Sequence, residues 1–97
     1  MTAPNVLRLL PWQGPEGKPC YLSTGDRDGY MSRLADNIES VQLGSAAELL
    51  ERACETLDTR DADLAEMRQL AHALAGSLRD VLRVAASRGG LLAARET

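Results

Sequence analysis

The sequence predicts a mainly α-helical, single-domain protein, in which an amino-terminal arm precedes three helices. All four prolines and all three aromatic residues lie at or before Tyr30, so the chain divides into residues 1–30 and residues 31–97. After Tyr30, apolar residues recur three and four positions apart, which places them on one face of a helix. A chain of 97 residues can bury only a small core. We therefore expect a second copy of the chain to cover part of these helices.

The arm has the composition of a β-hairpin. Val6–Trp12 and Cys20–Ser23 are predicted strands, and the Gly- and Pro-rich segment Gln13–Lys18 is a predicted turn. An isolated two-stranded hairpin is marginally stable in water, so this one has to pack on the helices. Trp12 and Tyr21 are its expected anchors because each carries a large apolar face. Proline at both ends of the turn leaves a strandless, extended arm as the alternative.

Three helices are predicted from capping and termination signals. The first spans Ser32–Val41, with Ser32 as its N-cap and Gly44 after its end. Ser45, followed three residues later by a glutamate, begins the second helix, which runs to Leu57. The third helix spans residues 62–87 and is predicted to stop at Gly89-Gly90. The short connection between the last two helices predicts an antiparallel helical hairpin.

The third predicted helix carries an unbroken apolar stripe. At 1.5 Å per residue this helix is about 39 Å long, whereas the second is only about 21 Å, so the second cannot cover the whole stripe. We expect the stripe to form the core or the seam of a homodimeric helical bundle. Its residues are Leu64, Met67, Ala71, Leu74, Leu78, Val81 and Ala85.

Gly76 lies in the middle of this helix, where glycine costs about 1 kcal/mol relative to alanine. Two interpretations stay open. Close helix packing against a patch of small residues would explain the glycine, and so would a kink that divides the helix in two.

Composition excludes several classes of function. The net charge of −3 gives no general attraction for nucleic acid or acidic membranes, and no segment has the length of a spanning helix. Cys20 and Cys54 are the only cysteines, and without an export signal they are expected to be reduced thiols in a cytoplasmic protein. One histidine and two separated cysteines do not make a zinc site. We find no catalytic triad, cofactor motif or metal motif, which predicts a protein that is not an enzyme.

Two short strings imitate ligand-binding loops. The spacing Gly14-x-x-Gly17-Lys18 is two residues too short for a phosphate-binding loop, and a proline follows the lysine. The string Asp26-x-Asp28-Gly29 would place Ala35 where a calcium loop needs glutamate. Both are predicted to be turns.

A possible phosphoacceptor lies in the long helix. The segment Ala71–Ser77 resembles the phosphorylated helix of histidine phosphotransfer domains, which carry His-x-Leu-Lys-Gly followed by a small residue. The resemblance implies His72 as the phosphoacceptor, although Ala75 stands where that family has lysine. An exposed surface histidine is the competing interpretation.

The carboxyl-terminal quarter of the chain is basic. Arg79, Arg83 and Arg88 could form a patch that binds anions or nucleic acid, or they could complement the acidic segment from Asp36 to Glu66. The absence of interleaved aromatic residues and of a basic total favours the second interpretation.

Along most of its length the chain resembles small actinobacterial proteins of no assigned activity. The segments that carry the resemblance are Leu10–Leu22, which contains Trp-x-Gly-Pro-Glu-Gly-Lys-Pro-Cys-Tyr-Leu, Ser32–Asp36 and Arg83–Ala85. The resemblance implies a similar fold and a bacterial cytoplasmic setting. The sequence as a whole predicts a non-enzymatic, regulatory protein that binds another protein and acts as a homodimer, without a cofactor. Phosphotransfer through His72 and anion binding by the terminal arginines are the alternatives.

Overall fold

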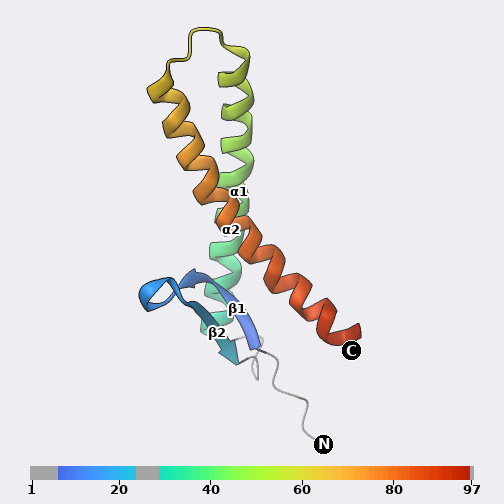
Figure 1. Cartoon of the computed structure of the whole chain (residues 1–97). Helices are drawn as coiled ribbons and strands as arrows, with labels where there is room; N and C mark the ends of the chain where they lie inside the picture. Colours follow the sequence, from blue (N-terminus) through green and yellow to red (C-terminus); the bar gives the residue numbers. More distant parts are fainter. Residues whose placement is uncertain (1–6, 24–28, 97) are drawn as a thin grey trace, which may run out of the picture.

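The protein consists of a β-hairpin packed on two long antiparallel helices (Figure 1). A computed structural model describes residues 7–23 and 29–96. The molecule is elongated, with dimensions of 63 × 29 × 22 Å. Its elements are β1 (Leu7–Gln13), the short 3₁₀ helix η1 (Pro15–Gly17), β2 (Pro19–Ser23), α1 (Tyr30–Asp58) and α2 (Leu64–Glu96).

The arm is a hairpin, as the turn-flanked strands predict. β1 and β2 pair antiparallel, with Leu9 opposite Tyr21 and Gln13 opposite Pro19. Between these pairs, β1 contains three residues and β2 contains only Cys20, so the ladder has a bulge. Bulges tolerate proline because the ladder there lacks regular hydrogen bonds. The bulge therefore explains how Pro11 lies within a strand.

The turn between the strands is the Gly-x-x-Gly-Lys segment. The Gly14 amide donates a hydrogen bond to the Lys18 carbonyl at 2.7 Å, which closes the loop. Glu16 and Gly17 both have positive φ, at 60° and 74°, a region that glycine adopts at low cost. This segment is a structural turn, as predicted.

The prediction of three helices is wrong, because the first two are one helix in the described part of the chain. α1 begins at Tyr30 with Gly29 as its N-cap and continues through Gly44 and Ser45 to Asp58. The cause lies in its buried and half-buried positions, which keep the same three- and four-residue spacing on both sides of Gly44, from Ser32 to Thr56. A continuous helix thus keeps one buried face, and this face outweighs the local stop and cap signals.

α2 is also longer than predicted. It begins at Leu64, where the Asp63 carboxylate accepts a hydrogen bond from the Glu66 amide at 2.8 Å and caps the helix. It passes through Gly89-Gly90 and ends at Glu96, so the predicted stop is wrong. Leucine, alanine and arginine follow these glycines, and their high helix propensity favours continuation. The helix is continuous through Gly76, and a Cβ atom at this position would meet no atom within 4 Å.

Each helix uses one contact stripe toward the rest of the molecule. The residues of the α1 contact stripe lie three and four positions apart. The first half of the stripe faces the hairpin, and the second half faces α2. Its residues are Ser32, Ala35, Glu39, Gln42, Ala46, Leu49, Ala53 and Thr56, all buried or half-buried. The α2 contact stripe consists of Met67, Leu70, Leu74, Ser77, Val81 and Val84, also buried or half-buried.

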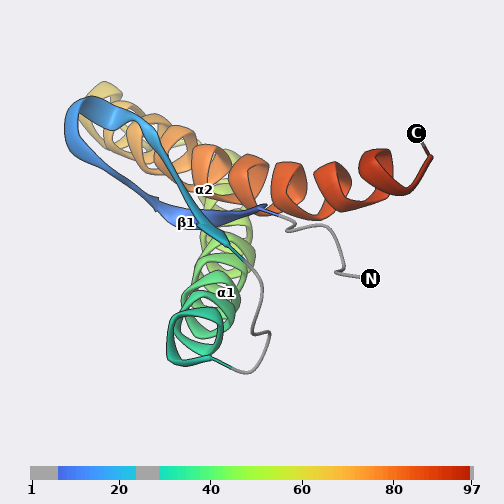
Figure 2. The same ribbon diagram turned by 90° about the horizontal axis from the view of Figure 1, so that it is seen from below.

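Leu10 is the hairpin's buried apolar side chain, whereas the two predicted anchors are less covered. Leu10 is 5% exposed, Trp12 is half-buried and Tyr21 is 56% exposed. The bulge accounts for the difference, since it turns Leu10 and Pro11 toward the helices. Seen from below, the hairpin lies beneath the point where α2 crosses α1 (Figure 2).

Polar contacts fix the hairpin in this place. The Arg8 guanidinium donates to the Ser32 carbonyl at 3.2 Å and pairs with Asp36 at 2.6 Å and Glu39 at 3.2 Å. The Pro11 carbonyl accepts hydrogen bonds from Gln42 of α1 at 2.9 Å and from Arg83 of α2 at 3.4 Å. One bulged strand thereby connects both helices.

Candidate interaction surface

A second apolar stripe on each helix lies outside the internal contacts. From Leu43 on α1, and along α2, it occupies positions one residue after the contact stripe. One of these positions on α2 is the exposed, charged Arg68. We call the two stripes together the outer face. Its residues are Leu43, Ala47, Leu50, Cys54 and Leu57 on α1, and Leu64, Ala71, Ala75, Leu78, Leu82 and Ala85 on α2; all are exposed except Leu43, which is half-buried.

Both stripes turn to the same side of the molecule. One residue step rotates a position by about 100° around a helix axis. Because α1 and α2 run antiparallel, the same step taken on each helix from its contact stripe leads to the same side of the pair. Positions one residue before the contact stripe lie on the opposite side. Arg83, which bonds to the hairpin, is one of these, whereas Asp36, which pairs with Arg8, follows the contact residue Ala35 by one. The hairpin therefore bonds to positions on both sides of the contact stripes.

The predicted seam is divided between the two faces of α2. Met67, Leu74 and Val81 are half-buried and belong to the contact stripe. The alternate seam residues, Leu64, Ala71, Leu78 and Ala85, are exposed on the outer face, with Leu64 at 74% and Leu78 at 58%. The apolar arc of α2 is wider than one seam, and α1 covers only half of it.

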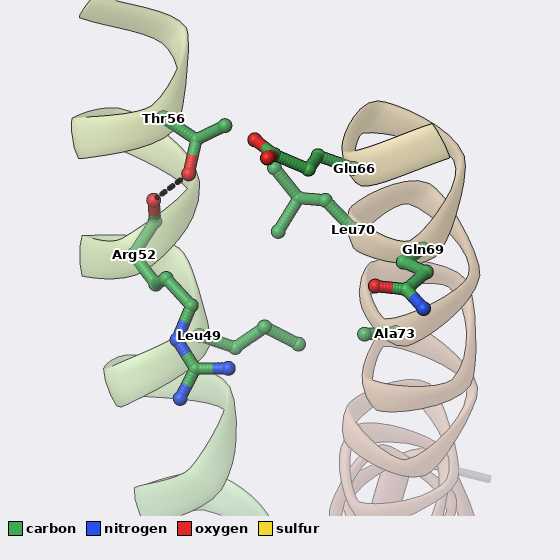
Figure 3. Close-up of a pocket in the computed structure, with 7 residues that line it drawn as sticks. All are labelled: Leu49, Arg52, Thr56, Glu66, Gln69, Leu70 and Ala73. Atoms are coloured by element: carbon green, nitrogen blue, oxygen red, sulfur yellow. Dashed lines mark hydrogen bonds between the residues drawn. The ribbon is translucent and has the colours of Figure 1, made fainter. Parts of the chain in front are cut away.

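The side opposite the outer face contains an open groove between the helices. Figure 3 shows Leu49 and Thr56 of α1 directed toward Leu70 and Glu66 of α2 across this gap. The groove has a volume of about 400 Å³. Arg52 and Gln69 add polar groups to its lining, so this side of the helix pair is more polar than the outer face.

His72 lies at the edge of the outer face. It is exposed, and with Arg68, Ala71 and Ala75 it lines a shallow depression of about 210 Å³. The small alanines leave the depression open, and a large side chain from outside can enter it.

The three carboxyl-terminal arginines have different environments. The Arg83 guanidinium is 14% exposed and bonds to Pro11 and to Asp80, where the distance is 3.4 Å. Arg79 and Arg88 are exposed. Arg83 therefore belongs to the packing of the hairpin.

Several other predicted features can be placed. Cys20 and Cys54 are both free thiols, half-buried and exposed respectively. Within residues 7–23 and 29–96, no cluster of three potential metal ligands is found. Asp26 and Asp28 lie outside the described residues. Neither described helix contains an apolar stretch that could cross a membrane.

Sequence reasoning missed three features of this architecture. The α1 half of the outer face was missed because the sequence does not separate the exposed positions Leu50, Cys54 and Leu57 from the contact positions Leu49 and Ala53. The Asp63-x-x-Glu66 cap is readable too, as a capping signature. The pairing of Arg8 with α1 has no local signal, since its partners lie 24 or more residues away.

The chain matches no protein-family model, no curated protein and no solved structure. The structure defines its class as an elongated helical hairpin with exposed apolar residues.

Proposed function

We propose that this chain is a non-enzymatic, regulatory protein-binding module that acts as a homodimer through its outer face. The observation that carries the proposal is the alignment of two apolar stripes, one from each helix, on a single side. Single exposed apolar residues are ordinary on protein surfaces, but a contiguous exposed patch is typical of an interaction site.

The balance of buried and exposed side chains supports the proposal. In the described part of the chain, four apolar residues are buried, and two of these are alanines. Ten large apolar or aromatic side chains are exposed, five of them on the outer face. Burying a leucine side chain contributes about 1.5–3 kcal/mol, so a partner on this face would add substantially to a thin core.

The proposal is tested by comparing two variants with similarly exposed positions on α1. Leu50, on the outer face, is 60% exposed, and Val41, away from it, is 67% exposed. We expect Leu50→Gln to weaken self-association by about 30-fold in Kd, equivalent to about 2 kcal/mol, because it removes an apolar contact. Val41→Gln should leave the dimer unchanged.

Molar mass is measured by light scattering during size-exclusion chromatography, over a dilution series of each protein. Circular dichroism establishes that each variant has kept its helices. Equal dissociation of both variants, or of neither, would contradict the assignment of the outer face as the binding surface.

A further inference from the structure

We infer that two copies associate with α1 of each chain lying on α2 of the other, around a twofold axis parallel to the helices. This inference rests on the proposed function, because it specifies how the outer faces meet. Two symmetric arrangements are available to two identical faces. A twofold axis parallel to the helices places α1 of one copy on α2 of the other. A twofold axis perpendicular to the helices places α1 on the other copy's α1, and α2 on its α2.

Charges at the edges of the outer face distinguish these arrangements. The α1 edge is acidic, with Glu51 and Asp58 exposed beside the stripe. On α2, Arg68 lies within the stripe and Arg79 beside it, and both are exposed. When α1 meets α2, Glu51 and Asp58 of each copy lie nearest Arg68 of the other, whereas Arg79 is about 12 Å or more from both along the axis. When each helix meets its counterpart, like charges oppose each other, which disfavours that arrangement.

The side-chain sizes of the two stripes also favour α1 of one copy on α2 of the other. The α1 stripe carries large side chains at seven-residue intervals, at Leu43, Leu50 and Leu57. The α2 stripe has its alanines at 71 and 75, where the depression of about 210 Å³ lies. A leucine that enters such a hole is the packing unit of paired helices.

The positions of Leu50, Ala71 and Ala75 along the helix axes fit this arrangement. Leu49 lines the inter-helix groove together with Leu70 and Ala73; Figure 3 shows it level with Ala73, with Leu70 nearer Thr56 and Glu66. A twofold axis parallel to the helices keeps every residue at its own height. Leu50 then meets the partner's Ala71 and Ala75, and Glu51 comes within about one helical turn of the partner's Arg68.

Site-specific cross-linking of full-length chains tests this geometry. Two variant chains are prepared, and both carry Cys20→Ser. In the first variant, Cys54 is then the remaining thiol. The second also carries Cys54→Ser and Ala71→Cys, with a mass tag. After mixing, a short bismaleimide should join the two chains through Cys54 and the new thiol at position 71. Mass spectrometry separates this product from internal links.

The controls are each chain alone, and we expect neither to form a linked dimer efficiently. Efficient linkage of the Cys54 chain to itself, or of the position-71 chain to itself, would overturn the inferred arrangement in favour of like helices in contact. No linkage in a sample that sediments as a dimer would also overturn it, while leaving the proposed function intact. A sample that sediments as a folded monomer would overturn both.

Discussion

At the residue scale, Arg8 has the largest number of distinct polar partners described here. Its guanidinium reaches Ser32, Asp36 and Glu39, and both Arg8 and Glu39 have side chains that are largely shielded from solvent. Asp36 is much more exposed, so its ion pair is screened and contributes little. The pair with Glu39 has the greater energetic consequence, because an unpaired buried carboxylate is costly.

This pair predicts an asymmetry between single and double variants. Arg8→Met should destabilise the protein by about 3–5 kcal/mol, because it leaves the charge of Glu39 buried without a partner. The double variant Arg8→Met with Glu39→Met should lose less, since it removes both charges. Urea unfolding followed by circular dichroism measures both. A double variant that is less stable than Arg8→Met would contradict this account of the Arg8–Glu39 ion pair.

At the element scale, local stop signals failed twice. A buried face continues through Gly44, and residues of high helix propensity follow Gly89-Gly90. Gly44 with Ser45, and Gly89 with Gly90, are typical of helix boundaries, yet α1 and α2 pass through them. The hairpin, the antiparallel helix pair and the mainly helical class were predictable, because they follow from turn residues and periodicity. The split of the α2 stripe between two faces was not, since it depends on where α1 crosses.

Gly76 offers a direct test of this element-scale account. Neither close packing nor a kink explains the glycine, since α2 is continuous and a methyl group at this position meets no atom within 4 Å. Gly76→Ala should therefore stabilise the protein by about 1 kcal/mol, the difference in helix propensity. Thermal unfolding measures the change. A lower Tm would indicate that the position needs glycine for a contact outside the described residues or in a partner.

At the scale of the whole molecule, the hairpin and the outer face have complementary roles. The hairpin covers one side of the helix crossing and connects both helices through the Pro11 carbonyl. The outer face keeps leucines and alanines exposed, with Cys54 and Arg68 among them. We interpret the elongated shape, with a long dimension of 63 Å, as that of one half of a larger helical bundle.

The most direct test of self-association is the mass of the unmodified chain in solution. Sedimentation equilibrium at tens of micromolar should give twice the chain mass of 10.5 kDa, because in the proposed dimer a second copy covers the outer face. Dilution should shift the mass toward that of one chain. A folded species that sediments at 10.5 kDa across the whole concentration range would contradict the dimer.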